Sequence, residues 1–275
     1  MPSLKLANRT IATDMPAFVM SIVNADHDSF FAKSRGGFSL AKKHIEQGAD
    51  IIDIGGESTR PGSRYIDAKE EIRRVVPVIK KIRRFSDIPI SVDTRKYDVM
   101  SAAFDAGADI LNDISALEDD PRLARFSAKE KIPVILMHKK GIPSTMQSQA
   151  SYKDVFKEVN EYLDHRAKIA LQNGISSDKI IVDPGIGFGK NTAQNAVLIS
   201  RAGELCDKRF MVLMALSRKR FFGEVCGRDV NDRLFGTAAA NVYSILNGVS
   251  MIRVHDTVAA VDSVKVIREL LHAGS

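Results

Sequence analysis

Residues 48–54 read Gly-Ala-Asp-Ile-Ile-Asp-Ile, and residues 107–113 read Gly-Ala-Asp-Ile-Leu-Asn-Asp. In each stretch a glycine precedes a short apolar run that carries or ends on acidic or amide side chains. Glycine can take the left-handed conformation that ends a helix before the next strand begins. The two stretches therefore predict the junction between one strand–helix unit and the next. Gly174 and Gly248 are placed similarly, which indicates that the unit repeats along the chain.

Apolar runs of strand length recur along the whole sequence, and nearly every one leads to a polar residue. The eight runs are Phe18–Val23, Ile51–Ile54, Ile88–Val92, Ile110–Leu111, Val134–Met137, Ile180–Val182, Met211–Leu216 and Met251–Val254. They lack polar alternation, which is typical of parallel strands buried on both faces. Polar residues at the same end of each strand favour a barrel whose active site lies at one mouth.

Amphipathic segments separate these runs. We expect helices over Leu40–Gln47, Ala68–Arg84, Tyr97–Ala106, Arg122–Lys131, Tyr152–Asn173, Ala193–Glu204, Asp232–Leu246 and Val258–Leu271. Eight strand–helix units fit a closed (β/α)8 TIM barrel better than an open doubly wound sheet. We therefore predict an α/β fold with a single barrel domain over residues 1–275. Leu4–Leu6 and Thr10–Ala12 are expected to form a short N-terminal hairpin over the barrel floor.

The bulk composition excludes several classes of protein. The 275 residues are 44% apolar and 27% charged, with a formal net charge of +6, which is ordinary for a globular domain. Basic residues are not interleaved with aromatic ones, so we expect no nucleic-acid partner and read the positive bias as suited to an anionic small substrate. No apolar stretch or signal pattern predicts a membrane partner. Two cysteines without metal-ligand spacing favour a cytoplasmic protein.

The glycine-rich stretch Asp183-Pro-Gly-Ile-Gly-Phe-Gly-Lys190 follows an expected strand. It is not a phosphate-binding P-loop, because Pro184 stands where that motif needs glycine and Asn191 where it needs Ser or Thr. One interpretation is a turn that simply needs positive φ. The other is a loop whose backbone lies close to a flat ligand, with Asp183 projecting into the barrel mouth.

Two polar strand ends and one long loop are also open to two interpretations. Asp93 and Asn112 could cap the helices that follow them or bind a ligand at the mouth. The loop Asp53–Gly62 mixes glycines with Ser, Thr and Arg, which suits either a mobile lid or a solvated surface loop.

Basic side chains follow the last two strands. Lys219 could form a Schiff base, donate as a cation to a ring heteroatom, or belong to a solvated turn. Arg253 and His255 alternate on one strand and so face the same side. They suit a phosphate or pyrophosphate, although a buried histidine satisfied by backbone is the simpler alternative. Carboxylates at such a mouth would bind the guanidine-like edge of a pterin or guanine ring.

With these residues in place, the chain resembles the dihydropteroate synthases of the pterin-binding barrel family. The resemblance extends from about Phe18 to Leu271. Its motifs are DIGGESTRPG at 53–62, SVDT at 91–94, Asn112-Asp113, Leu136–His138 with the residues up to Gln147, DPGIGFGK at 183–190 with Asn195, SRK at 217–219 and RVHD at 253–256.

The resemblance implies that 6-hydroxymethyl-7,8-dihydropterin pyrophosphate condenses with p-aminobenzoate, by a dissociative route, to give 7,8-dihydropteroate and pyrophosphate. It implies catalytic roles for Lys219, Arg253, His255 and Asn24, with Mg²⁺ as cofactor and Asn24 as its ligand. The implied substrate-binding residues are Asp93, Asn112, Met137, Asp183, Phe188 and Lys219 for the pterin, and Thr59, Arg60, Pro61, Lys219 and Arg220 near p-aminobenzoate. It also implies a homodimer and a sulfonamide target.

The sequence departs from the family pattern in the first loop. The usual Asn-Val-Thr-Pro-Asp-Ser-Phe is here Asn-Ala-Asp26-His27-Asp-Ser-Phe, and Ala32 occupies a later Asp position. Loss of the proline predicts a less rigid loop. Two alternatives stand beside the synthase. A pterin-dependent methyltransferase would share the barrel and the acidic pterin pocket, and the altered first loop leaves open a paralogue that binds a pterin with weak or no catalysis.

Overall fold

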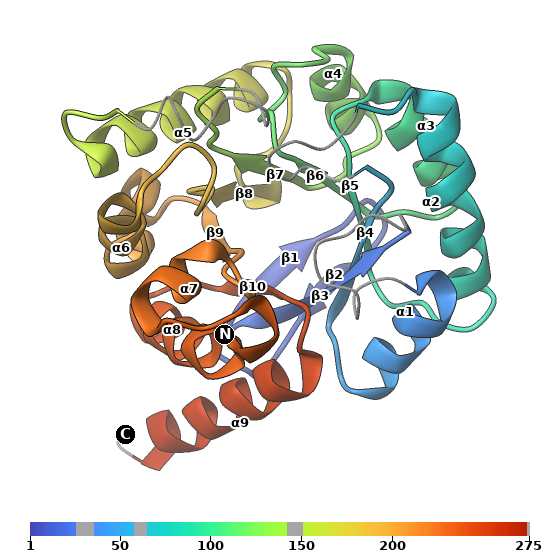
Figure 1. The fold of residues 1–275 in the computed structure, drawn as a ribbon. Helices are drawn as coiled ribbons and strands as arrows, with labels where there is room; N and C mark the ends of the chain where they lie inside the picture. The colour runs from blue at the N-terminus through green and yellow to red at the C-terminus, as the bar shows by residue number, and fades with distance from the viewer. Residues whose placement is uncertain (26–35, 58–64, 142–150, 274–275) are drawn as a thin grey trace.

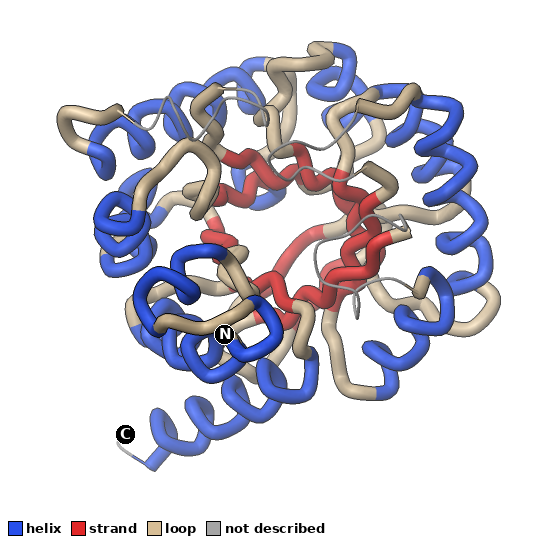
Figure 2. Tube along the Cα trace, in the orientation of Figure 1, coloured by secondary structure: helices blue, strands red, loops and turns tan. Residues whose placement is uncertain are grey.

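The computed structural model describes residues 1–25, 36–57, 65–141 and 151–273. Among these residues, eight parallel strands close into a barrel in the order β10-β3-β4-β5-β6-β7-β8-β9 (Figures 1 and 2). The strands are β3 Phe18–Asn24, β4 Ile51–Gly55, β5 Ile90–Asp93, β6 Ile110–Asp113, β7 Val134–Met137, β8 Ile180–Asp183, β9 Met211–Met214 and β10 Met251–Val254. The prediction of a TIM barrel is confirmed.

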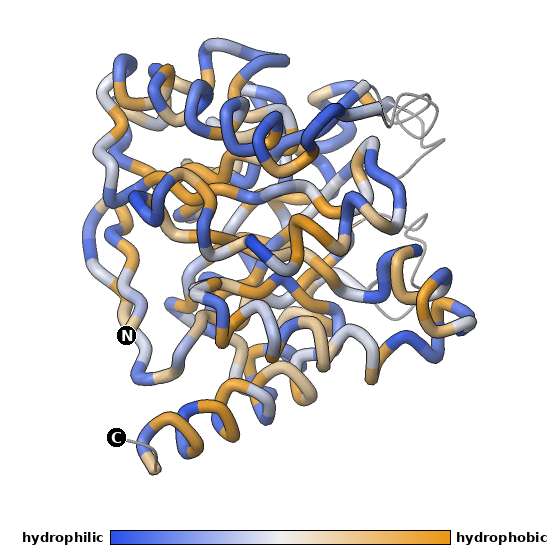
Figure 3. The backbone as a smooth tube through the Cα atoms, turned by 90° about the vertical axis from the view of Figure 1, so that its left-hand side faces the viewer, coloured by the Kyte–Doolittle hydropathy of each residue, from blue (hydrophilic) through white to orange (hydrophobic). Residues whose placement is uncertain are grey.

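Helices form the outer ring of the barrel (Figure 2). They are α1 Gly37–Glu46, α2 Ala68–Arg83, α3 Tyr97–Asp105, α4 Arg122–Lys129, α5 Val155–Gln172, α6 Thr192–Ser200, α7 Arg220–Cys226, α8 Leu234–Leu246 and α9 Thr257–Ala273. Apolar and polar residues alternate along them, as α9 shows clearly in Figure 3, because each helix buries only one face against the barrel. No helix in the described part of the chain is long and apolar enough to cross a membrane.

An antiparallel hairpin of β1 (Ser3–Lys5) and β2 (Thr10–Ala12) covers one end of the barrel, as predicted. Leu4 and Leu6 insert into a buried cluster at that end. Their neighbours there include Phe18, Met20, Ile51, Ile110, Ile135, Ile181, Leu213 and Met251, all from barrel strands. The hairpin therefore closes the amino-terminal floor and leaves the carboxyl end of the strands as the site of ligand access.

The alternation of side chains along each strand explains why the polar residues gather at the other end. Residues two apart on a strand face the same side. The floor residues Ile51, Ile110, Ile135, Ile181 and Met251 lie two positions before Asp53, Asn112, Met137, Asp183 and Arg253, respectively. Each of these five strands thus contributes an apolar side chain to the floor and a polar or predicted site side chain one layer above it.

Two helices differ from the sequence prediction. α7 was not expected, because Ser217–Arg220 was interpreted as a turn; Lys219 has extended backbone at its N-cap and the helix runs on to Gly227, which is left-handed (φ 64°). The helix expected over Ala193–Glu204 ends at Ser200, and a 3-10 segment over Ala202–Lys208 follows it. Cys206 and Asp207 in that segment have positive φ, which a continuous α-helix cannot accommodate.

Candidate active site

An arginine held between two buried carboxylates forms the centre of the barrel mouth. The Arg253 Nε donates to Asp53 Oδ2 at 2.6 Å, and its Nη2 donates to Asp93 Oδ2 at 2.8 Å. Asp53 is fully buried. The Asn112 Nδ2 lies 3.3 Å from Asp53 Oδ1. Strands β4, β5, β6 and β10 are therefore joined by one polar network inside the barrel.

Asp93 is the carboxylate of this network with unused hydrogen-bonding capacity. Its Oδ1 is buried and has no hydrogen-bond partner among the residues that the structure describes. Burial raises the pKa of Asp93 to about 7, although the positive charge of Arg253 opposes that shift. A buried polar atom without a partner is costly, so Asp93 is well placed to accept a hydrogen bond from a ligand.

Asn24 lies in the same layer as Asp93, with strand β4 between their two strands. The register of the barrel aligns Asn24 with Gly55 and Gly55 with Asp93. An ideal Cβ at Gly55 would lie 3.7 Å from Asn24 Oδ1 and 3.8 Å from the Asp93 Cβ. The absence of a side chain at Gly55 lets both residues approach each other across the β4 strand.

Asp183 and the glycine-rich loop form the opposite wall. Asp183 is 3% exposed, and its Oδ1 accepts from the Gly185 amide at 2.7 Å. Burial raises the pKa of Asp183, while Lys219 is the strongest opposing charge. Gly185 has φ 65°, and a Cβ there would lie 1.9 Å from the His138 carbonyl oxygen. Only glycine allows the loop to pack so closely against the end of β7.

Lys219 reaches into the mouth from the start of α7. Its Nζ donates to the Ile186 carbonyl oxygen and lies 5.0 Å from the centroid of the Phe188 ring. Met137, aligned with Asp183 in the barrel register, adds a buried apolar surface. Burial lowers the pKa of Lys219 to about 8, against the attraction of Asp183. The ammonium, the carboxylate and the apolar surfaces of Met137 and Phe188 therefore lie together, a combination that suits a flat polar ring.

The lowered pKa of Lys219 predicts an alkaline limit to ligand binding. Its folded-state pKa of about 8 is below the free-lysine value of 10.5, so the ammonium loses its proton as the pH rises through about 8. We expect the dissociation constant of a pterin ligand to rise at least tenfold between pH 7 and pH 9.5, as measured by calorimetry.

The control for this prediction is Lys219→Arg. A guanidinium keeps its charge throughout that range, which separates the titration of the lysine from that of the ligand. We expect the arginine variant to lose most of the alkaline limb. The same limb in both proteins would show that Lys219 does not donate to the ligand.

His255 stands beside Arg253 but is not a cation in this structure. Its Nδ1 lies 2.9 Å from Ser217 Oγ, and its backbone amide donates to the same oxygen at 3.1 Å. Burial, followed by the charges of Arg253 and Arg218, lowers the pKa of His255 to about 3. His255 can therefore offer an anion a neutral N–H, whereas positive charge must come from other groups.

The loops that carry Lys219 and His255 are tied together by a buried ion pair. The Arg218 guanidinium donates to both carboxylate oxygens of Asp256, at 2.7 and 2.8 Å. Arg218 also has φ 56°, a conformation that non-glycine residues adopt rarely and at functional sites. The strained residue turns the chain sharply between Ser217 and Lys219.

A second set of charges lies on the rim, outside the barrel mouth. Glu57 pairs with Arg95 at 2.9 Å, Arg95 pairs with Asp119 at 2.9 Å, and Lys139 pairs with Asp119 at 3.3 Å. Lys96 is 8% exposed and pairs with Glu57 and Glu71. These pairs link the loops that follow β4, β5, β6 and β7.

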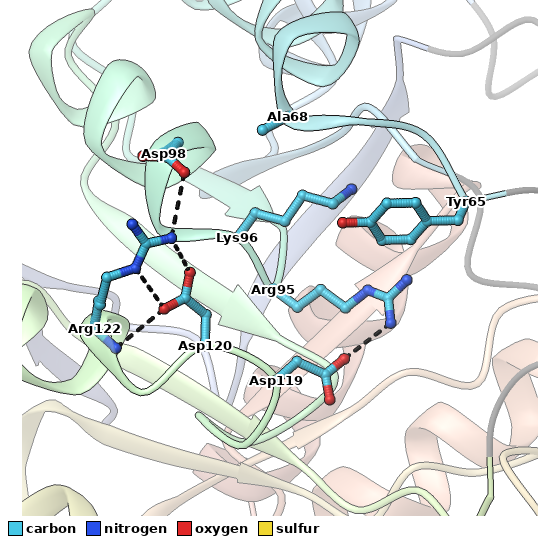
Figure 4. Close-up of a pocket in the computed structure, with 8 residues that line it drawn as sticks. All are labelled: Tyr65, Ala68, Arg95, Lys96, Asp98, Asp119, Asp120 and Arg122. Atoms are coloured by element: carbon cyan, nitrogen blue, oxygen red, sulfur yellow. Dashed lines mark hydrogen bonds and ion pairs between the residues drawn. The ribbon is translucent and has the colours of Figure 1, made fainter.

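The rim also contains a depression of about 190 Å³. Figure 4 shows Lys96 and Arg95 beside the Tyr65 ring, Arg95 bonded to Asp119, and Arg122 bonded to Asp98 and Asp120. The Lys96 Nζ lies 4.4 Å from the Tyr65 ring centroid. Each of these charged side chains already has a partner. We therefore interpret them as holding the loops in place and not as lining a ligand-binding site.

The structure brings most of the predicted site residues to one mouth. Asn24, Asp93, Asn112, Met137, Asp183, Phe188, Lys219, Arg253 and His255 all lie at the carboxyl ends of strands or in the loops that follow them. Arg220, the first residue of α7, instead has an exposed side chain paired with Glu224. Thr59, Arg60 and Pro61, like Asp26, His27 and Ala32, lie outside the described residues.

The sequence prediction missed Asp53 as a site residue. It also divided the site into a pterin group and a leaving-group pair, whereas Arg253 of the second group is bonded to Asp93 of the first. The available signal was the position of Asp53 within the otherwise apolar run Ile51–Gly55. A buried carboxylate in a strand needs a partner, so Asp53 could have been expected to bond to another site residue.

Carboxylates, an amide and a lysine around a glycine loop at a barrel mouth define the class of a barrel enzyme that binds a flat, polar heterocycle. Known proteins agree with that class. The profile of the family described as pterin binding enzyme matches residues 20–255. The chain is 40% identical to the dihydropteroate synthase of Escherichia coli strain K12, over 93% of this chain and 92% of that protein.

Other relatives point the same way. The Synechocystis dihydropteroate synthase is 39% identical, over 90% of this chain and 88% of that protein. A Yersinia pestis dihydropteroate synthase structure with a sulfonamide drug complex has a TM-score of 0.92 at 34% identity, covering 99% of this chain and 100% of that one. A Xanthomonas albilineans dihydropteroate synthase structure with 4-aminobenzoic acid has a TM-score of 0.88 at 38% identity, covering 98% of both chains. The chain belongs to the dihydropteroate synthase family of pterin-binding enzymes.

Proposed function

We propose that this chain joins 6-hydroxymethyl-7,8-dihydropterin pyrophosphate to p-aminobenzoate, giving 7,8-dihydropteroate and pyrophosphate in folate biosynthesis. The observation that carries the proposal is the position of Asp183 and Lys219, two buried side chains whose charges interact, beside the Phe188 ring at the barrel mouth. The solved Xanthomonas albilineans synthases include one with 4-aminobenzoic acid and one with 7,8-dihydropteroate, which supports the same substrate and product here.

The pterin ring is bound by its donors and acceptors. Its 2-amino group and N3–H form a paired donor edge that one carboxylate accepts in two parallel hydrogen bonds. Asp183 serves as that carboxylate, and the Gly185 amide fixes its orientation. Asp93 Oδ1, which has no partner in the described part of the chain, and Asn112 contact other polar edge atoms. Lys219 donates to a ring heteroatom on the opposite side.

Bond breaking at the pterin methylene separates charge. The C–O bond to pyrophosphate breaks, the electron pair leaves with pyrophosphate, and the methylene cation is delocalised into the ring. Arg253 and the neutral N–H of His255 stabilise the developing anion. The aryl amine of p-aminobenzoate is uncharged near pH 7, so it attacks without a strong base and releases its proton afterwards. Water must be excluded at this stage, since it would capture the cation.

The described side chains offer Mg²⁺ few protein ligands. No group of three His, Cys, Asp or Glu side chains in the described residues is placed to hold a metal. Mg²⁺ commonly takes one or two protein oxygens and completes its shell with substrate phosphates and water, and Asn24 Oδ1 offers one such oxygen. The residues fit a metal that arrives with pyrophosphate, with Asn24 as its protein ligand. When bound, it would neutralise charge on the leaving group.

A homodimer is the proposed assembly. Exposed apolar side chains gather on α7, α8 and α9, which lie side by side (Figure 1). They are Val225, Phe235, Tyr243, Leu246, Val258, Val266, Leu270 and Leu271. A group of exposed apolar side chains on neighbouring helices is typical of a protein–protein interface. Two free cysteines, Cys206 and Cys226, support the proposal of a cytoplasmic location.

The dimer proposal predicts a change of mass. Phe235 is 85% exposed and Leu270 is 68% exposed, so Phe235→Glu combined with Leu270→Glu should bury unpaired charge in the interface and give a monomer by light scattering. Phe85→Glu, at an exposed position beyond the C-terminus of α2, is the matched control and should leave the mass unchanged. A monomeric wild type would contradict the proposal.

The catalytic proposal is tested by detecting the product. The purified protein, Mg²⁺, the pterin pyrophosphate and p-aminobenzoate should yield 7,8-dihydropteroate by mass spectrometry. A sulfonamide should raise the apparent KM for p-aminobenzoate without changing kcat. Pterin binding without product would favour the non-catalytic paralogue, and non-competitive inhibition would place the second substrate elsewhere.

A further inference from the structure

Lys190 is a buried lysine that the proposed mechanism does not use. It ends the glycine-rich loop between β8 and α6 and is 2% exposed. Its Nζ lies 2.9 Å from His138 Nδ1, and it donates to the carbonyl oxygens of Gly185 at 2.9 Å and Phe188 at 3.0 Å. The His138 carbonyl oxygen is more distant, at 3.4 Å. A lysine ammonium has three N–H donors, so the three nearest acceptors use all of them.

The contacts of Lys190 fold the loop back on itself and onto β7. Two of its acceptors, the carbonyls of Gly185 and Phe188, belong to the loop, and the third is the side chain of His138 at the end of β7. The His138 amide in turn donates to the Asp183 carbonyl oxygen at 3.0 Å. The ammonium therefore sits inside the turn that begins with Asp183 and carries the Phe188 ring.

The same loop supports the Lys219 side chain. The Ile186 carbonyl oxygen accepts from Lys219 Nζ, and the Phe188 ring lies beside it. Asn195 provides a second anchor, because its Oδ1 accepts from the Gly187 amide at 2.9 Å and its Nδ2 lies 3.3 Å from the Lys190 carbonyl oxygen. Movement of this loop would displace three predicted pterin contacts together.

We infer that Lys190 is a positioning residue for the pterin site, which holds the Gly185–Phe188 turn so that Asp183, Phe188 and Lys219 keep the spacing a pterin ring requires. The inference rests on the proposed function for the identity of the ligand. Lys190 itself does not touch the substrate; it acts through the loop.

The charge of Lys190 gives the inference a second readout. Burial raises the pKa of Asp183, and the positive charges that oppose this shift are Lys219, Arg253 and Lys190. Burial lowers the pKa of Lys190 itself, and the negative charge of Asp183 opposes that shift and favours the ammonium. Removing this ammonium should raise the pKa of Asp183 further. The acid limit of pterin binding should then move to higher pH, which loss of packing alone would not cause.

The chain offers a matched control at the barrel floor. Lys179 Nζ also donates to three carbonyl oxygens, those of Lys5 at 3.2 Å, Leu6 at 2.8 Å and Lys131 at 2.6 Å. It ties the N-terminal hairpin to the floor, at the opposite end of the barrel from Asp183. Loss of its ammonium removes a comparable set of bonds without disturbing the mouth.

The test compares Lys190→Met with Lys179→Met, using 6-hydroxymethylpterin as the probe in calorimetric titrations between pH 5 and pH 8. We expect Lys190→Met to raise the dissociation constant at least tenfold and to move the acid limit to higher pH. Lys179→Met should lower the melting temperature but keep the dissociation constant within twofold of the wild type. Equal losses of affinity in the two variants, or an unchanged affinity in Lys190→Met, would overturn the inference.

Asn195→Ala keeps the test informative if Lys190→Met does not fold. It removes the second anchor of the same loop and should weaken pterin binding in the same direction, whereas wild-type affinity would overturn the inference. The probe needs no turnover. A wild type that binds it but forms no dihydropteroate would therefore contradict the proposed reaction and leave the role of Lys190 open to measurement.

Discussion

Asp183→Asn should lower the affinity for the pterin substrate by at least about 100-fold, with a similar loss in kcat/KM. The substitution keeps the size of the side chain and one carbonyl oxygen that can accept from Gly185. It replaces the second acceptor with an N–H₂ group that meets the donor edge of the pterin. Loss of two charge-assisted hydrogen bonds costs about 3 kcal/mol or more, which corresponds to that factor.

This loss should not come from unfolding. The pKa of Asp183 is raised in the folded protein, so the ionised form destabilises the fold at pH values above the ordinary range of the carboxyl group. Removing the charge should leave the melting temperature equal to or above that of the wild type. Asp178→Asn, at an exposed carboxylate on the barrel floor that pairs with Lys5, is the control and should bind normally. Wild-type affinity in Asp183→Asn would show that another group reads the donor edge.

Arg253→Met should give the largest loss of stability among the site variants, about 3–5 kcal/mol at pH 8. It leaves Asp53 and Asp93 buried without the guanidinium that bonds to both. The pKa of Asp93 is already raised to about 7 and should rise further without that charge. Since a protonated Asp93 no longer needs a partner, the loss should be smaller at pH 5.5 than at pH 8, as measured by urea denaturation.

A double variant separates stability from function. Arg253→Met with Asp53→Asn removes one of the two stranded charges and should recover part of the lost free energy of unfolding. Catalysis should stay low, because the cation that faces the leaving group is still missing. If Arg253→Met alone matched the wild type in stability at pH 8, the ion pairs of Arg253 with Asp53 and Asp93 would contribute nothing to the free energy of unfolding.

Short-range pattern was enough to predict the architecture. Glycines before Ile51 and Ile110, and apolar runs that end on polar residues, specify the repeated unit and its orientation. The end of α6 could not be predicted in this way, because Ala193–Glu204 has ordinary helical composition and the helix stops where Arg201 leaves helical geometry, with φ −119° and ψ 12°. α7 was missed because the polar residues Ser217, Arg218 and Lys219 directly precede it and Arg220 begins it.

The sequence predicts which residues lie at the site better than it predicts the hydrogen bonds and ion pairs between them. Asp93, Asn112, Asp183 and Lys219 were expected at the mouth from motif and strand position. The bonds of Arg253 to Asp53 and Asp93 depend on strands far apart in sequence but close across the barrel. The contacts of Lys190 depend on a loop folding back onto β7. Neither follows from local pattern.

We propose above all that this barrel mouth couples the two substrates and releases pyrophosphate. The direct measurement is continuous detection of pyrophosphate with the wild-type protein and Mg²⁺ in four mixtures: both substrates, each alone, and neither. We predict release only when both are present, in equal amount to the dihydropteroate formed. Release that is absent from the complete mixture, or that does not depend on p-aminobenzoate, would contradict the claim.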